Sequence, residues 1–197
     1  MRLRALSVRS LLALGLAALP AFGAAPKAPA KAAGACGRPV PQAVLKAPQA
    51  GLVSDTFKKT AEREATETAT LDGGATLTIT HWGCWAVMLT FRLESKGLPD
   101  YGKDVAGGYQ EAARQLRRLA ALKARTGFNL EKAAAAVEAE AKGGKGLAYI
   151  RPAAIPGSGR DQVTVQGAGP AGKNGNFLAF ELMRVLPRKK AKARAAK

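Results

Sequence analysis

Apolar and polar residues alternate through residues 61–93, and this period of two predicts β-strands. The loop 72–74 separates two of them, and its sequence Asp-Gly-Gly suits a three-residue turn with glycine in the left-handed conformation. That loop length pairs Ala65 with His81 on one mainly apolar face. The opposite face then carries three pairs of threonines, namely Thr70 with Thr76, Thr68 with Thr78 and Thr66 with Thr80. We expect this face to be solvated, with a flat binding surface as the alternative.

Two amphipathic helices are expected after these strands. The first begins at Asp104 and ends near Gly127, and the second follows Asn129, a good N-cap residue, and stops at 143–144. The apolar stripe of the first helix consists of Val105, Tyr109, Ala112, Leu116 and Leu119. The apolar side of the second consists of Leu130, Ala133, Ala134, Val137 and Ala141. Together the helices form a helical hairpin.

Four further strands are predicted, at 85–93, 146–151, 161–166 and 176–186. The last is apolar on both sides, which indicates a central strand covered on both faces. The glycine-rich segment 167–174 matches the start of a phosphate-binding loop, but no helix is expected after it, so we interpret it as a hairpin loop. The fold class is therefore α+β, mainly an antiparallel sheet with an inserted two-helix hairpin.

The first 23 residues have the pattern of a secretory signal peptide. A run of leucine and alanine spans 11–19, Pro20 follows it, and small residues lead to a cleavage site after Gly23, with Ala25 as the second choice. Three arginines precede the run, at Arg2, Arg4 and Arg9. The alternative is a membrane anchor, but Pro20 leaves the run short of the roughly 20 residues that span a bilayer. We expect a periplasmic or secreted protein that is not an integral membrane protein.

The positive charge is concentrated outside the expected domain. The chain has 31 lysines and arginines against 14 acidic residues, yet the domain at 52–187 holds 18 basic and 14 acidic residues, a net charge of +4. A linker rich in alanine, proline and lysine is expected at 24–51, and a basic tail at 188–197. The basic residues of the tail are Arg188, Lys189, Lys190, Lys192, Arg194 and Lys197.

The basic tail suits electrostatic contact with anionic envelope polymers or lipid headgroups. A solvated segment with no specific partner is the alternative. Specific nucleic-acid recognition is not expected, because no aromatic residue lies among these cations to stack on bases.

Export changes how the two cysteines are interpreted. In an oxidising compartment Cys36 and Cys84 are expected to form a disulfide. The alternative is a metal site that adds His81, but no second histidine exists to complete a common ligand set. No metal and no cofactor are therefore expected. In the same segment, His81 is expected to be a structural residue on the apolar face, with contact to a partner as the alternative. Trp82 on the threonine face is the better candidate partner contact, unless the tethered segment near Cys36 covers it.

The sequence contains no clear catalytic constellation, so it favours an exported cell-envelope protein with a non-enzymatic binding or structural domain. The alternative is a periplasmic hydrolase that uses two carboxylates converging in a cleft. Its candidate acids are Glu62, Glu64, Glu94 and Asp100.

Overall fold

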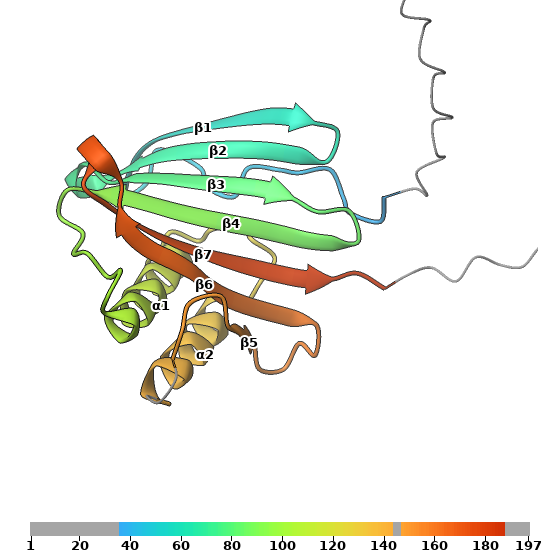
Figure 1. The fold of residues 1–197 in the computed structure, drawn as a ribbon. Helices are drawn as coiled ribbons and strands as arrows, with labels where there is room; N and C mark the ends of the chain where they lie inside the picture. The colour runs from blue at the N-terminus through green and yellow to red at the C-terminus, as the bar shows by residue number, and fades with distance from the viewer. Residues whose placement is uncertain (1–35, 144–146, 188–197) are drawn as a thin grey trace, which may run out of the picture. The chain divides into compact units, whose positions relative to one another are not determined.

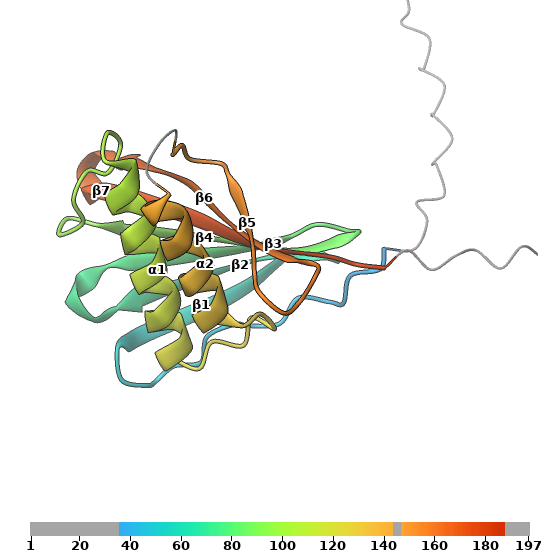
Figure 2. The same ribbon diagram turned by 90° about the horizontal axis from the view of Figure 1, so that it is seen from below.

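The computed structural model describes residues 36–143 and 147–187, which form a seven-stranded antiparallel sheet with two helices on one face (Figures 1 and 2). The strand order is β1-β2-β3-β4-β7-β6-β5. The strands are β1 (Leu52–Ala61), β2 (Glu64–Leu71), β3 (Thr76–Trp82), β4 (Ala86–Ser95), β5 (Pro152–Ala154), β6 (Asp161–Pro170) and β7 (Asn176–Val185). The helices are α1 (Val105–Ala121) and α2 (Leu130–Lys142). The predicted α+β fold with an inserted helical hairpin is confirmed.

The β2–β3 hairpin has the predicted register. Ala65 pairs with His81, and the three threonine pairs lie opposite one another. Residues 72–74 form the connection, in which Gly73 and Gly74 have φ angles of 78° and 77°. A side chain at either position would strain the backbone, which explains the two glycines.

The two faces of the sheet differ in what lies on them. We call the side under α1 and α2 the covered face and the other side the open face (Figure 1). The covered face supplies the core of the protein, with Ile79, Phe91 and Phe180 fully buried. The rings of Phe91 and Phe180 stack with centroids 5.1 Å apart. Strands β4 and β7 therefore form the centre of both the sheet and the core.

Each helix begins at the expected capping residue. The side chain of Asp104 accepts a hydrogen bond from the Gly107 amide at 2.9 Å, and that of Asn129 accepts one from the Lys132 amide at 3.0 Å. Both bonds satisfy amides that have no partner within the first turn of a helix. The predicted starts of the two helices are thus confirmed by their capping geometry.

The segment that precedes β1 also contributes to the core. Val44 and Leu45 are 2% and 3% exposed, although they lie in the stretch that the sequence analysis assigns to a linker. Their amides donate hydrogen bonds of 2.7 Å to the two carboxylate oxygens of Glu67 on β2. Residues 36–51 therefore contribute to the packing against the sheet. Their only large aliphatic residues are Val40, Val44 and Leu45, too few to form a pattern that predicts this.

Two strands differ from the sequence prediction. The strand expected at 146–151 is wrong over its described part, because Ile150 has a φ of 70° and the strand β5 follows at Pro152–Ala154. Strand β1 was not predicted, because its segment has polar residues on both faces and no alternation. Both are edge strands. β1 carries the exposed Lys58 and Lys59, and β5 has three residues including Pro152.

Strand β7 is central, as predicted, but helices cover only one of its faces. Leu178, Phe180 and Leu182 lie on the covered face and are fully buried. On the open face, Phe177 is half-buried under the Arg92 guanidinium, which lies 4.0 Å from the centroid of its ring. Neighbouring side chains, rather than a second layer of structure, therefore shield this face of β7.

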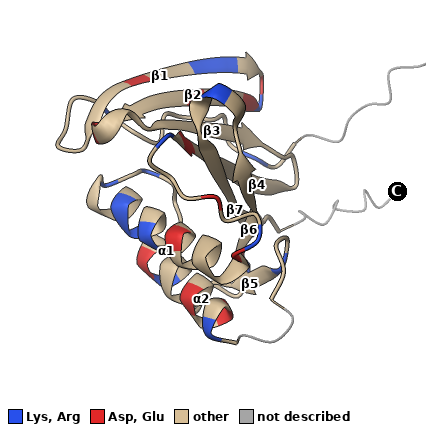
Figure 3. Cartoon of the chain, turned by 60° about the vertical axis from the view of Figure 1, so that its left-hand side comes forward, with Lys and Arg blue, Asp and Glu red and all other residues tan. Residues whose placement is uncertain are grey.

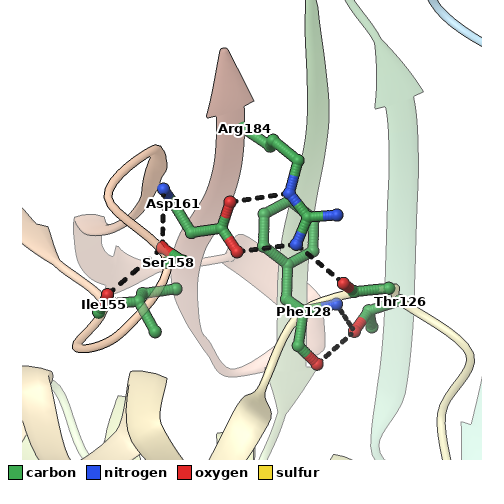
Figure 4. A network of polar contacts seen from close by, with 7 residues as sticks. Thr126, Phe128, Ile155, Ser158, Asp161 and Arg184 are labelled. Carbon is green, nitrogen blue, oxygen red and sulfur yellow. Dashed lines mark hydrogen bonds and ion pairs between the residues drawn. The ribbon is translucent and has the colours of Figure 1, made fainter. Parts of the chain in front are cut away.

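A polar network joins the end of β7 to the connection between α1 and α2 (Figure 4). The guanidinium of Arg184 donates two hydrogen bonds of 2.6 Å to Asp161 and a third of 2.8 Å to the Gly127 carbonyl. It also lies 4.9 Å from the centroid of the Phe128 ring. Bidentate arginine–carboxylate pairs are geometrically specific, so this network fixes the helical connection against the sheet.

Candidate functional site

His81 and Trp82 are neighbours in the sequence but lie on opposite faces of β3. His81 is 2% exposed on the covered face, whereas Trp82 is 40% exposed on the open face. The predicted placement of both residues relative to the hairpin register is therefore confirmed. At 40% exposure, Trp82 is not covered by the described part of the segment near Cys36, which begins at Cys36 itself.

The open face carries a transverse row of hydroxyl groups. Strand register places Lys58, Thr66, Thr80, Thr90, Glu181 and Thr164 side by side across β1, β2, β3, β4, β7 and β6. None of the helices in the described part of the chain lies over this row (Figure 1). The open face therefore presents side chains, mostly neutral and polar, that can exchange hydrogen bonds with a partner.

Trp82 is held in place by a chain of hydrogen bonds within this face. Its indole Nε1 donates to the Thr90 hydroxyl at 2.9 Å, and that hydroxyl donates to Glu181 Oε2 at 3.1 Å. One hydroxyl thus accepts from the ring and donates to the carboxylate. The indole is fixed at its polar end, although Trp82 is 40% exposed.

Glu181 is the most unusual ionisable group of the open face, because it is only 8% exposed and has no basic partner among the described residues. Burial raises its pKa above the ordinary value, and the hydrogen bond from Thr90 opposes part of that rise. The Trp82–Thr90–Glu181 chain therefore ends in a carboxyl group that holds its proton to higher pH than an exposed glutamate.

On the open face, the side chains on the strands next to Trp82 are apolar, and charged side chains lie further along β4. Register places Met88 beside Trp82 and Met183 beside Met88, and both methionines are half-buried. Further along β4, Arg92 donates a hydrogen bond of 2.7 Å to Glu94. The hydrogen bond from Arg92, together with one from Asn174, lowers the pKa of Glu94.

On the covered face, His81 lies beside two groups that sequence reasoning did not assign to a site. Its ring meets that of Phe57 edge to face, with centroids 5.6 Å apart, and its Nε2 lies 3.7 Å from Glu67 Oε2. Glu67 could have been found from the sequence, because it is a carboxylate on the otherwise apolar side of a predicted strand. Glu181 gave no comparable signal, since its strand is apolar on both sides.

Cys36 and Cys84 form the predicted disulfide, with their Cα atoms 5.0 Å apart. A disulfide sulfur is not a thiolate, so the alternative metal site with His81 is not formed by these residues. The bond fastens the segment before β1 to the connection between β3 and β4. Trp85, 45% exposed, lies beside this tether, and a Cβ on Gly37 would lie 3.8 Å from its ring.

The four acids proposed for a hydrolase do not meet in one pocket. Glu62 and Glu64 lie at the β1–β2 turn, where Glu62 forms an ion pair with Arg63 at 3.1 Å. Glu94 lies at the far end of β4 and Asp100 in the connection that follows it. These four residues therefore supply no pair of carboxylates in a cleft, which is the arrangement that this chemistry needs.

Charges of both signs are distributed along α1 and α2 (Figure 3). The six residues proposed for polyanion contact, Arg188, Lys189, Lys190, Lys192, Arg194 and Lys197, lie outside the described residues, as does the expected signal peptide. Within the described part, neither helix is long and apolar enough to cross a membrane. Comparisons with protein families, with curated proteins and with solved structures found no match to this chain.

Proposed function

We propose that this chain is an exported domain of the cell envelope that binds an acidic polysaccharide through the open face of its sheet. The observation that carries the proposal is the uncovered face with Trp82 exposed and held by Thr90. The basic tail at 188–197 attracts the polymer, and the open face makes the close contacts. The domain binds its partner and does not convert it.

Export is supported by the pattern of residues 1–23 and by the Cys36–Cys84 disulfide. Disulfides persist in oxidising compartments such as the periplasm and the extracellular space. These features support an envelope location, where acidic polysaccharides are abundant partners for a basic protein.

A sugar ring suits the side chains around Trp82. The flat face of an indole packs against the apolar side of a sugar, and an indole fixed by its Nε1 hydrogen bond loses little conformational entropy on binding. Nearby threonines of the open face, Thr66 and Thr80 among them, offer hydroxyl groups to the hydroxyls of the sugar, whereas the hydroxyl of Thr90 already bonds to Trp82 and Glu181. The open face therefore provides both stacking and hydrogen bonding over an extended surface.

The charge of the partner is inferred from the tail. Six of its ten residues are basic and none is acidic. Such a segment binds polyanions through counterion release, with an affinity that falls steeply as salt increases. A lipid surface would share this attraction but would not need the threonine rows, so we favour the polysaccharide.

The proposal is tested with three variants of the full-length chain, bound to heparin and, in parallel, to anionic lipid vesicles. Deletion of residues 188–197 is expected to abolish retention on heparin at low salt. Trp82→Ala is expected to weaken heparin binding by about tenfold, because a buried aromatic contact contributes roughly 1–2 kcal/mol. Trp85→Ala, which removes the other exposed indole beside the disulfide, is the matched control and should bind as the wild type does.

Equal heparin affinity for Trp82→Ala and the wild type would overturn the role of the open face. Unchanged retention after deletion of the tail would overturn its electrostatic role. A stronger effect of Trp82→Ala on vesicles than on heparin would replace the polysaccharide with a lipid surface as the partner.

A further inference from the structure

A pocket of about 280 Å³ lies on the side of β3 opposite to Trp82. Its walls come from three parts of the chain: the segment 38–44, the ends of β3 and β4, and the connection between α1 and α2. The side chains that carry charge or polar hydrogens there are Arg38, Gln42, His81, Arg125 and Thr126. Its volume is near the lower limit for ligand pockets, which indicates a small ligand or the end group of a larger one.

Arg38 is an unusual residue for the wall of a pocket, because it is 3% exposed and forms no ion pair with any described residue. Its Nη1 donates to the Arg63 carbonyl at 3.0 Å, and its own carbonyl accepts from Arg63. Burial lowers the pKa of Arg38, although the charge of Glu64 opposes part of this effect. An arginine remains protonated in proteins, so the pocket contains a cation whose charge no described carboxylate pairs directly.

His81 adds a buried polar atom with no hydrogen bond. Its Nε2 has no partner among the described residues, and the nearest carboxylate oxygen, Glu67 Oε2, is 3.7 Å away. Both oxygens of Glu67 already accept hydrogen bonds from backbone amides. A buried polar atom without a partner costs about 1–3 kcal/mol, so a ligand that reaches this imidazole would be stabilised there.

The third charged group, Arg125, is positioned by the backbone rather than by an acid. Its amide donates to the Val44 carbonyl at 2.8 Å, which joins the helical connection to the segment 38–44. The residues that follow Arg125 are held by strand β7, because Arg184 donates a hydrogen bond of 2.8 Å to the Gly127 carbonyl (Figure 4). The side chain of Arg125 is exposed and has no ion pair within the described residues.

A larger pocket of about 510 Å³ lies along α1, and its arginines provide a comparison. Arg114 is paired with Glu111, and Arg117 is paired with Glu138. The cations of that pocket form ion pairs, whereas no carboxylate in the described part of the chain forms an ion pair with Arg38 or Arg125. The smaller pocket is therefore the one of the two whose arginines form no ion pair with a described carboxylate.

We propose that the pocket formed by Arg38, His81 and Arg125 binds a small oxyanion, the carboxylate or phosphate group of a sugar acid or similar molecule. The guanidinium groups pair with the oxygens, and the imidazole of His81 provides a further polar contact. This site is separate from the open face, so it can exist whether or not that face binds a polymer.

The test uses NMR, because His81 is the only histidine in the chain and its imidazole resonances are unambiguous. Glucuronate, inorganic phosphate and glucose are titrated separately into the full-length protein. We expect saturable shifts of the His81 resonances with glucuronate or phosphate, and none with glucose, which has the ring but not the charge. The response to the two anions distinguishes a carboxylate site from a phosphate site.

Arg125→Gln is the informative variant, because the side chain is exposed and its loss leaves the backbone contact to Val44 intact. It is expected to weaken anion binding at least about tenfold, as expected for loss of a charge-assisted hydrogen bond. Arg160→Gln, the same change at an exposed arginine outside the pocket, is the control and should leave the affinity unchanged. Equal weakening by both variants, equal shifts with glucose, or no shift of His81 with either anion would overturn the proposal.

Discussion

The two faces of the sheet each bury one glutamate, and the two carboxyl groups differ in their hydrogen-bond partners. On the covered side, Glu67 is fully buried and accepts two backbone hydrogen bonds of 2.7 Å. On the open side, Glu181 is 8% exposed and accepts one hydrogen bond, from Thr90 at 3.1 Å. Glu67 fastens the segment before β1 to the sheet, whereas Glu181 ends a chain of side chains that leads to the exposed Trp82.

The contrast distinguishes the face that holds the core from the face that is proposed to bind a polymer. The covered face contains the stacked aromatic rings and the aliphatic core, and its buried acid is satisfied by backbone groups. The open face contains threonines, and its buried acid accepts one side-chain hydrogen bond, from Thr90. The proposed polymer surface lies on the open face, whereas the one buried side-chain atom without a hydrogen bond in the described part of the chain, His81 Nε2, lies on the covered side in the proposed oxyanion pocket.

The largest difference between the faces is expected in the free energy of unfolding. Phe91→Ala should lower it by about 3–5 kcal/mol, because it removes a fully buried ring from the core. Thr80→Ala on the open face should change it by no more than about 0.5 kcal/mol. Chemical denaturation of the oxidised protein measures both values. Similar losses for the two variants would show that something also covers the open face.

A smaller change in the free energy of unfolding is expected for Glu67, the buried acid of the covered face. Glu67→Gln should lower the free energy of unfolding by about 2 kcal/mol, because a glutamine has one acceptor oxygen for two backbone amides. Glu62→Gln, which removes an exposed ion pair with Arg63, is the control and should cost less than about 1 kcal/mol. Denaturation of the two variants under identical conditions gives the comparison. A cost for Glu67→Gln no greater than that of the control would remove the fastening role of this carboxylate.

The smallest effect is a pH dependence of the free energy of unfolding that Glu181 causes. Its pKa is raised in the folded protein, so the folded state binds this proton more tightly than the unfolded chain does. The resulting stabilisation is complete below the ordinary pKa of a glutamate and is lost as the pH rises through the raised pKa. Glu181→Gln cannot titrate, so the free energy of unfolding of the wild type should fall relative to this variant as pH rises.

Urea denaturation over a series of pH values measures that difference. In a Trp85→Phe background, the fluorescence of Trp82 should follow the same titration, because Thr90 links the indole to Glu181. Parallel pH profiles for the wild type and Glu181→Gln would show that this carboxyl group does not titrate differently from an exposed one.

Local patterns in the sequence predicted the parts of the fold that local physics determines. The loop 72–74 fixed the hairpin register, and Asp104 and Asn129 marked the starts of the helices. Strand β1 was missed because its polar residues show no alternation. Strand β5 was misplaced because short edge strands depend on their neighbours more than on their own residues.

The sites were less predictable than the fold. The placement of Trp82 on the open face could be predicted from its position in a strand, and the structure added its link to Glu181, which lies 99 positions further along the chain. The arginines of the small pocket, Arg38 and Arg125, come from the segment before β1 and the connection between the helices. Neither segment has a periodic pattern, so no property of the sequence indicated that the backbone of Val44 would join them.

The edges of the sheet restrict how the protein can meet other molecules. A bare sheet edge is a template on which further strands can add, which is the route to fibrous aggregates. Here β1 ends one side with Lys58 and Lys59, and β5 ends the other with three residues including Pro152, which has no amide hydrogen to donate. Association between copies by strand addition is thus opposed by charge on one edge and by a missing donor on the other.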